Sequence, residues 1–325
     1  MTIDTKLITP RPLPVAPKVE SPATPAAQNT VSSAGTAPTK DSFQTGHVHG
    51  ASCGCGKPKV TGDELAKVEA KVADKVAEIQ ANKADGSTSL TPVEPKVIDV
   101  YFHVITKGAG PKNGDVSQEQ IEAQIKVLND AYKDAGFQFN LVEVDRTKNA
   151  KWYTGQPGTS AETDMKSTLR KGDSEALNIY STSPSGGLLG WATFPSDYKD
   201  FPKDDGVVIL NTSLPGGTSA PYNEGDTATH EVGHWMGLHH TFNQPGLPDN
   251  DSVSDTPEHE VNYGKPPETT DTVPGKPGND PVHNYMNYTD DDWMYEFTPG
   301  QVDRMQAQWE LFRETSPSST ELLAA

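Results

Sequence analysis

The residues whose types and spacing could support catalysis lie in one stretch, His230 to His240, which reads HEVGHWMGLHH. In a helix of about 3.6 residues per turn, residues four apart share a face, so His230 and His234 can offer two imidazoles to one cation. Glu231 then lies beside that cation. This spacing predicts a zinc site with a general base next to it.

The third histidine reaches the same cation only if the chain turns. A straight helix would carry His240 about 9 Å beyond His234 along its axis, out of reach of one ion. Gly237 tolerates the left-handed conformation that ends helices, so the chain can turn there and bring His240 back. Three protein ligands leave a fourth position for water, as in catalytic zinc sites. His239 should then point away from the metal, towards neighbouring side chains or solvent.

The long pattern is specific. HExxH should arise by chance in roughly one or two per hundred chains of this length, and HExxHxxGxxH in roughly a few per hundred thousand. The alternative is a surface helix that happens to be rich in histidine. The rarity of the full pattern makes this alternative weak.

HExxHxxGxxH followed by a methionine turn is the signature of the metzincin zinc endopeptidases, which this sequence resembles. With the later segment DPVHNYMNYTDDDWMYEFTPGQ, residues 280–301, it is similar to the pappalysin, or cytophagalysin, branch (M43). The resemblance extends over residues 95–312. It implies an α/β (α+β) fold, a metzincin-like zincin catalytic domain with a twisted mixed sheet, a long backing helix, a zinc helix and a C-terminal subdomain that carries the methionine turn.

The resemblance also implies a function. It indicates a zinc-dependent endopeptidase that hydrolyses peptide or protein substrates by means of a glutamate-activated, zinc-bound water. The residues it assigns are His230, His234 and His240 on zinc, Glu231 as general base, Met286 beneath the metal and Tyr288 at the oxyanion. Without the family, Met286 and Tyr288 would be interpreted as core residues. The alternative function, a catalytically silent metal-binding or adhesion module of the same fold, is disfavoured because Glu231 is present.

Composition limits the partners and the compartment. The chain has 325 residues, 33% of them hydrophobic, and 27 prolines, which favours one core with an end that does not pack. A formal charge of −18 argues against nucleic acid or an anionic membrane surface as partner. No apolar run approaches the roughly 20 residues of a membrane helix. The first residues lack the apolar core of a secretory signal, whereas the resemblance implies a secreted, extracellular protein; a cytoplasmic protein or another export route is the alternative.

Calcium is a second expected cofactor. Twelve Asp or Glu residues lie between Asp249 and Glu296, a density that repels itself unless water or cations separate the charges. The segment Asp249 to Glu260 resembles the calcium-binding loop of the family, and the resemblance implies Asp251, Asp255 and Thr256 as ligands. A solvated acidic loop is the alternative.

The N-terminal region is expected to lie outside the catalytic domain. Residues 1–50 are rich in Pro, Ala, Thr and Ser and predict a disordered leader or propeptide. Residues 51–94 contain a cysteine-rich segment, a helix over about 62–82 and an extended linker. Cys55, in CGKP, resembles the cysteine switch by which metzincin zymogens place a thiolate on zinc. Two alternatives stay open: a separate metal site built from the CGC segment and nearby histidines, and a tail without a role.

The catalytic domain is expected over residues 95–315, followed by a frayed tail over 316–325. Alternating apolar and β-branched residues predict strands over 97–105 and 137–144, with further strand candidates over 177–181 and 206–210. Helical periodicity with a capping box at Ser117 and Gln120 predicts a long helix over 117–135.

Three further elements complete the predicted domain. Residues 186–194 resemble the edge strand that pairs with substrate in metzincins, with a core hairpin as the alternative. Asn223 or Asp226 could cap the zinc helix. Thr298 begins the C-terminal helix, which runs to Phe312 and should bury a stripe made of Val302, Met305 and Trp309.

Overall fold

The structure is a computed structural model that describes residues 62–85, 95–243 and 250–315. All of these belong to one unit of the chain, residues 37–325. The predictions for the leader, for Cys55, for most of the linker and for the tail concern residues outside the described ranges. Within those ranges, no helix is long and apolar enough to cross a membrane.

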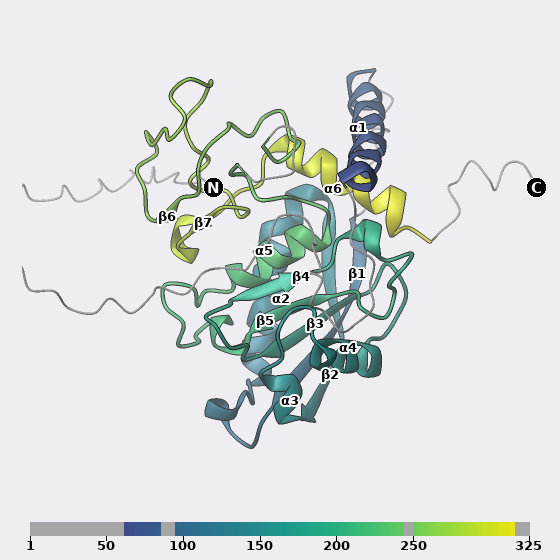
Figure 1. Ribbon diagram of the computed structural model, residues 1–325, viewed down its shortest axis with the longest axis vertical. Coiled ribbons are helices and arrows are strands. Elements are labelled where there is room, and N and C mark those ends of the chain that lie inside the picture. Colours follow the sequence, from purple (N-terminus) through teal and green to yellow (C-terminus); the bar gives the residue numbers. More distant parts are fainter. Residues whose placement is uncertain (1–61, 86–94, 244–249, 316–325) are drawn as a thin grey trace, which may run out of the picture. The chain divides into compact units, whose positions relative to one another are not determined.

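The fold is built on a five-stranded mixed sheet in the order β2-β1-β3-β5-β4. Four strands run parallel, and β4 pairs antiparallel with β5 at one edge (Figure 1). The strands are β1 (Lys96–Thr106), β2 (Phe137–Lys148), β3 (Leu177–Thr182), β4 (Gly190–Ala192) and β5 (Val207–Leu210), with a separate parallel pair of β6 (Tyr263–Gly264) and β7 (Tyr288–Thr289). The expected mixed sheet and the strand at its edge are confirmed.

Six α-helices accompany these strands in the described residues. They are α1 (Gly62–Ala84), α2 (Gln118–Tyr132), α3 (Ala150–Tyr153), α4 (Ser160–Leu169), α5 (Asp226–Trp235) and α6 (Pro299–Phe312). Short 3-10 turns lie at Pro111–Asn113, Lys133–Ala135, Pro195–Asp197, Asn211–Ser213 and Asp291–Trp293. The helices predicted over about 62–82, 117–135 and 298–312 are present, and so is the helix predicted to carry His230 and His234 and to end near Gly237.

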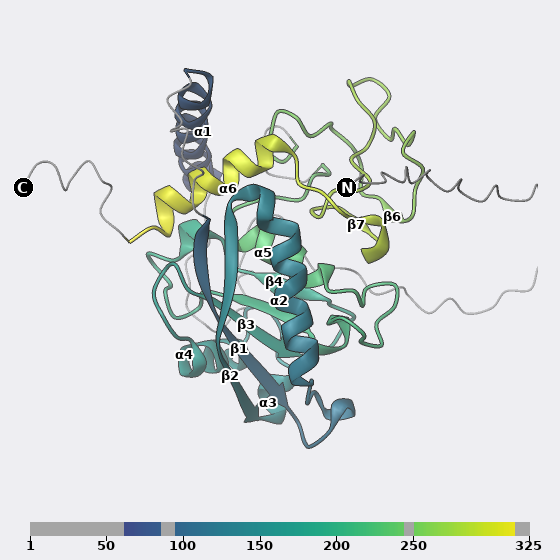
Figure 2. The same cartoon turned by 180° about the vertical axis from the view of Figure 1, so that it is seen from behind.

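Side chains alternate along β1 and so divide the core into two layers. Ile98, Val100, Phe102 and Val104 pack with α2, α5 and α6, whereas Ile105 packs on the opposite face with residues of α3 and α4. Figure 2 shows α2 running beside β1 and β2. The long backing helix therefore supports the sheet on the same face as the zinc helix.

Two helices begin with the capping boxes that the sequence predicts. The Gln120 amide donates to Ser117 Oγ at 3.2 Å, and the Ser117 amide donates to the Gln120 side chain at 3.3 Å. Thr298 and Gln301 repeat this arrangement at α6, where Pro299 occupies the first turn. Each box satisfies two backbone amides that a helix start would leave unpaired.

Helices α3 and α4 were not predicted. In α4, Lys166 is fully buried and forms a 2.8 Å ion pair with Glu162, whose carboxylate also accepts a 2.6 Å hydrogen bond from Trp191 Nε1. The buried face of α4 thus includes a charged pair beside Ala161 and Met165. A search for apolar periodicity misses such a helix.

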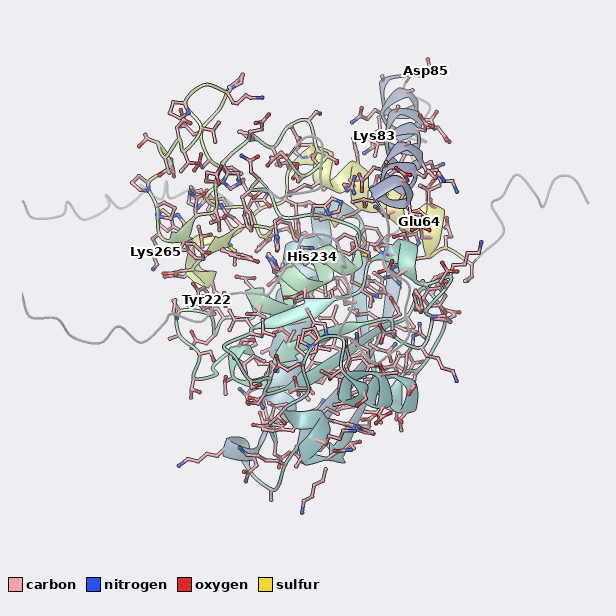
Figure 3. The ribbon with its side chains drawn as sticks, in the orientation of Figure 1. Glu64, Lys83, Asp85, Tyr222, His234 and Lys265 are labelled. Carbon is pink, nitrogen blue, oxygen red and sulfur yellow. The ribbon has the colours of Figure 1, made fainter. Side chains whose placement is uncertain are left out.

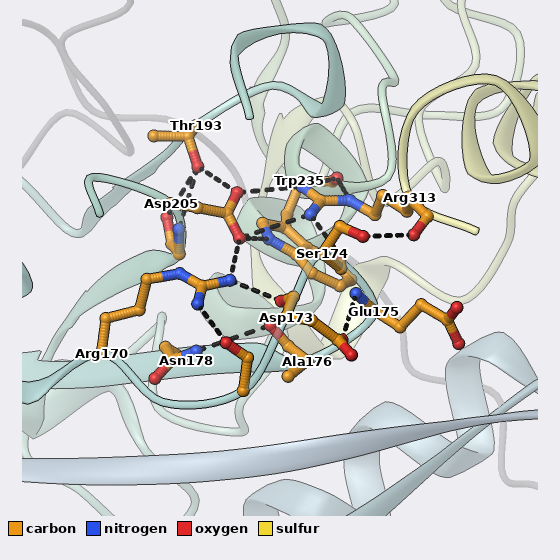
Figure 4. Close-up of polar contacts among 12 residues, drawn as sticks. Arg170, Asp173, Ser174, Glu175, Ala176, Asn178, Thr193, Asp205, Trp235 and Arg313 are labelled. Atoms are coloured by element: carbon orange, nitrogen blue, oxygen red, sulfur yellow. Dashed lines mark hydrogen bonds and ion pairs between the residues drawn. The ribbon is translucent and has the colours of Figure 1, made fainter. Parts of the chain in front are cut away.

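A buried carboxylate, Asp205, joins the sheet edge to the ends of α5 and α6 (Figure 4). It accepts hydrogen bonds from Thr193 Oγ1 at 3.0 Å, from Trp235 Nε1 at 3.2 Å and from the Arg313 guanidinium at 3.1 and 3.3 Å. Arg313 also donates to the Trp235 carbonyl, the last residue of α5, at 2.9 and 3.1 Å. These contacts hold the C-terminal end of α5.

We expect Asp205→Asn to lower the free energy of unfolding by about 3 kcal/mol, because it leaves the buried Arg313 charge without its closest counter-charge. Urea denaturation followed by tryptophan fluorescence measures this change. Asp200→Asn is the matched control, because Asp200 is exposed and its substitution should change stability by no more than about 0.5 kcal/mol. Equal stability of the two variants would contradict this role for Asp205.

Candidate metal centre

Helix α5 begins where a carboxylate from a distant segment meets its first amides. Asp291 Oδ2 accepts from the Glu224 amide at 2.9 Å and from the Asp226 amide at 3.4 Å. The N-cap residue is Gly225, with a φ of 106° and no side-chain cap of its own. The prediction that Asn223 or Asp226 caps this helix is therefore wrong. A carboxylate brought by the tertiary fold supplies the bond that a local side chain would otherwise make.

Helix α5 ends at the predicted glycine. Gly237 has a φ of +92°, its amide donates to the His234 carbonyl at 2.8 Å, and the Leu238 amide donates to the Gly233 carbonyl at 2.9 Å. This pair of bonds is the Schellman motif that closes a helix. A Cβ atom at position 237 would lie 2.4 Å from the Gln308 side chain. Both the backbone angle and the packing therefore require glycine at the turn.

The turn brings the three histidines together. The Nε2 atoms of His230, His234 and His240 lie 3.1–3.2 Å from one another, and all three rings are buried. Figure 3 marks His234 on α5, close to β4. Within the described ranges, these three histidines are the only group of at least three His, Cys, Asp or Glu side chains whose ligand atoms lie close enough together to hold one metal ion.

The chemistry of these rings fits a cation. His230 Nδ1 donates to the Tyr285 carbonyl at 2.7 Å, and His234 Nδ1 donates to the Leu238 carbonyl at 2.8 Å. These bonds place the protons on Nδ1, so the Nε2 lone pairs converge and repel one another unless a cation lies between them. Nitrogen ligands about 2.05 Å from a tetrahedral zinc would be spaced about 3.3 Å apart, close to the observed separation.

Glu231 follows the first of these histidines and is buried beside the edge strand. A Cβ atom at position 190 would lie 2.7 Å from both Glu231 Cγ and Oε1. Glycine at position 190 therefore allows β4 to pass directly against this carboxylate. Gly190 was not predicted from the sequence, because its importance comes from a contact with Glu231, which lies far beyond it in the chain.

Met286 and Tyr288 both lie close to the residues of the candidate metal centre. Met286 is buried beneath α5, where a Cβ atom at Gly233 would meet its sulfur at 2.4 Å, and its carbonyl accepts from the Thr241 amide at 3.3 Å. The Tyr288 hydroxyl lies 3.3 Å from His240 Nε2. The hydroxyl is thus within reach of a group held at the centre of the three histidines.

The expected calcium ligands are only partly brought together. Asp251 Oδ1 accepts from Thr256 Oγ1 at 2.6 Å and from the Val253 amide at 3.1 Å. Asp251 Oδ2 is buried and has no hydrogen-bond partner in the described part of the chain, and burial raises the pKa of this carboxyl to about 7. Asp255 instead accepts from the Gly300 amide and from Thr298 Oγ1 at the start of α6, at 2.8 and 2.7 Å.

His239 points away from the three histidines, as expected. Its Nε2 lies 3.0 Å from Glu69 Oε1, on α1, and the same carboxylate contacts Arg304 on α6. No local pattern marks this contact, because Glu69 and Arg304 are 235 residues apart in the sequence. Only the tertiary fold brings them to the side of the metal centre.

A mixed sheet with an antiparallel edge strand, two histidines on a helix that converge with a third beyond its terminal glycine, and a methionine turn define a metallopeptidase of the metzincin class. Comparisons with family models agree. The model described as pregnancy-associated plasma protein-A (peptidase M43) matches residues 181–310, and the metallopeptidase M12B reprolysin-like model matches residues 118–241.

Individual relatives identify the family. Extracellular metalloprotease 1 of Coccidioides posadasii is 40% identical over 246 residues, which cover 75% of this chain and 86% of that protein. Mature mirolysin of Tannerella forsythia, in complex with a cleaved peptide, is 28% identical with a TM-score of 0.57 and covers 68% of this chain and 97% of its own. A promirolysin mutant is 25% identical with a TM-score of 0.59, over 79% and 94% of the respective chains. The chain belongs to the M43 family of metalloproteases and is itself a metalloprotease.

Gly190→Ala tests the approach of β4 to the carboxylate. The added methyl group should displace Glu231 and lower peptide hydrolysis by about a hundredfold, because small displacements of a reacting group are costly. Zinc per chain should not change, since no histidine is touched. Gly275→Ala is the control, because a Cβ atom at position 275 meets nothing within 4 Å. Full activity of Gly190→Ala would show that the two groups need not be so close.

Proposed function

We propose that the protein hydrolyses peptide bonds with zinc held by His230, His234 and His240 and with Glu231 as general base. The observation that carries this proposal is the convergence of three buried Nε2 atoms within 3.2 Å, next to a buried carboxylate. Bound zinc would supply Lewis acidity, which polarises a peptide carbonyl and makes a coordinated water more acidic. The substrates are peptides or proteins, as in other metalloproteases.

The chain's own groups perform the proton transfers in this proposal. Glu231 accepts a proton from the attacking water and then donates it to the nitrogen of the leaving amine. Tyr288 donates a hydrogen bond to the oxygen that gains negative charge, a contact that costs no reorganisation when it is already in place. The edge strand β4 passes beside Glu231 and offers backbone groups to an extended peptide.

Glu231→Gln should retain the zinc and the fold but lose peptide hydrolysis by about 10² to 10⁴-fold, because an amide cannot accept the proton of water. Hydrolysis and zinc per chain are measured on the same sample, with circular dichroism to compare the folds. Substantial residual turnover at full zinc occupancy would remove the general-base role.

We also propose that Asp251 and Thr256 belong to a calcium site. The support is a buried carboxylate oxygen that lacks a hydrogen-bond donor in the described residues and a pKa raised to about 7 by burial. A calcium ion would compensate this buried charge with an oxygen-ligand site of the kind it prefers. Asp255, which contacts the start of α6, would take part only if its side chain turned towards the ion.

Calcium should raise the melting temperature of protein that has been stripped with a chelator and resupplied with zinc. An ion at about 100 times its dissociation constant stabilises the folded state by about 2.7 kcal/mol through mass action. Asp251→Asn should lose most of this shift. If the melting temperature of the parent protein does not change with calcium, the calcium site is ruled out and the segment is a solvated acidic loop.

The pH dependence has a defined sign. The folded pKa of Asp251 lies above its ordinary value, so without calcium the folded chain binds more protons and stability falls as pH rises from about 4 through about 7. Calcium binds the ionised carboxylate and should oppose this fall. Urea denaturation at several pH values, with the parent and Asp251→Asn, measures the difference.

The N-terminal region completes the proposal. We propose that residues 1–94 form a pro-segment with Cys55 as a zinc ligand in the latent state, that residues 95–315 form the catalytic domain, and that the enzyme acts outside the cell. Relatives named extracellular metalloproteases support this location. Promirolysin covers 79% of this chain and the mature form covers 68%, which supports an added segment before the catalytic domain. The role of Cys55 stays a prediction.

A further inference from the structure

Helix α1 is attached to the catalytic domain by polar contacts more than by apolar burial. Only Val72 is buried among its described side chains. Lys75 Nζ lies 2.9 Å from Glu310 Oε2, and Lys83 Nζ lies 2.5 Å from Asp303 Oδ1, both partners belonging to α6. Figure 1 shows α1 against α6, and Figure 3 marks Lys83 and Asp85 near its C-terminal end. Because the lysines of these pairs are partly exposed, the pairs contribute little to docking.

The contact made by Glu69 is different in kind. Its carboxylate accepts two parallel hydrogen bonds from Arg304 Nη1 and Nη2, both at 2.8 Å, and lies 3.0 Å from His239 Nε2. The Glu69 side chain is 13% exposed and that of Arg304 is 3% exposed. Burial alone would raise the pKa of Glu69, but the His239 hydrogen bond and the Arg304 charge hold it well below its usual range. This buried bidentate pair is the principal attachment of α1.

Both partners of Glu69 belong to the support of the third zinc histidine. Arg304 Nε donates to the Gly237 carbonyl at 2.9 Å, at the residue where the chain turns after α5. His239 directly precedes His240, and its ring lies 5.2 Å from that of Phe194. One carboxylate on α1 therefore contacts the side chains that brace the turn of residues 237–240 at its start and near its end.

We propose that Glu69 is a positioning residue that couples the docking of α1 to metal binding. Docked α1 holds Arg304 and His239, and through them the turn that presents His240. By thermodynamic reciprocity, a metal that requires this turn must strengthen the docking of α1 by the same factor. This inference rests on the proposed zinc site, but it does not depend on peptide hydrolysis.

Removal of the carboxylate identifies the coupled element. Without Glu69, the Arg304 guanidinium and His239 lose a shared acceptor in a buried position, so the turn gains alternative arrangements. Loss of the carboxylate then lowers the metal affinity as well as the stability of the docked helix. A simple structural contact would lower the stability of α1 and leave the metal affinity of the folded protein unchanged.

The first experiment measures zinc affinity by chelator competition in the full chain. Glu69→Gln should bind zinc about tenfold more weakly than the parent, as is common for changes around metal ligands. Glu78→Gln is the matched control on the same helix: its side chain is 59% exposed and pairs only with Lys75 in the described residues, and its zinc affinity should equal that of the parent. Equal affinity of the two variants would overturn the proposal.

The second experiment needs no substitution and so does not depend on how a variant folds. Backbone hydrogen exchange of α1 is measured in the parent chain with and without zinc, and exchange should slow by about the same tenfold factor when zinc is bound. In a chain that also carries Cys55→Ala, and so lacks the other proposed link between the N-terminal region and zinc, Glu69→Gln should lose this dependence on zinc. Identical exchange of parent α1 in both states would overturn the coupling.

Peptide hydrolysis, assayed separately, distinguishes this proposal from the proposed function. Zinc-dependent protection of α1 in the parent chain, together with no hydrolysis by a Cys55→Ala chain, which lacks the proposed latency ligand, would remove the proposed function and retain the coupling. Zinc-dependent hydrolysis, together with exchange of α1 that does not depend on zinc, would retain the proposed function and remove the coupling.

Discussion

Three buried imidazoles that direct their lone pairs at one another impose the main constraint on this structure. The rings of His230 and His234 are oriented by hydrogen bonds on their far sides, and the acceptors come from separate segments: the Tyr285 carbonyl for His230 and the Leu238 carbonyl for His234. The metal centre therefore forms only when the methionine turn and the turn after α5 are both in place. A cation converts their mutual repulsion into three favourable contacts.

The segments that satisfy this constraint are held by charged side chains at both ends of α5. Asp291 accepts from amides at the N-terminal end, and Arg304 and Arg313 donate to carbonyls at or just beyond the C-terminal end. This arrangement matches the helix dipole, which favours negative charge at the start and positive charge at the end. All three side chains follow Met286 in sequence, so the C-terminal part of the chain orients a helix that precedes it.

Sequence patterns predicted the parts of the site that depend on short spacing. The motif from His230 to His240 needs only residues within about three helical turns, and the capping box at Ser117 needs residues within one. Both are present. The prediction of the N-terminal cap of the zinc helix was wrong because the amide of Asp226 is bound by Asp291, which lies 65 residues away in the sequence. The charged pair inside α4 and the contact of Glu69 were not predictable for the same reason: their environments are made by distant segments.

The acidic composition shows why charge counts alone do not predict function. Asp205 is buried against a guanidinium and joins helix ends, whereas Asp291 is buried against backbone amides and begins the zinc helix. Asp251 is buried with one oxygen that has no donor among the described residues, and burial raises the pKa of this carboxyl to about 7. Because a buried carboxylate needs a compensating partner, this oxygen of Asp251 is the basis of the proposed calcium site. The net charge of −18 treats all three alike, and the partner of each carboxylate decides what it does.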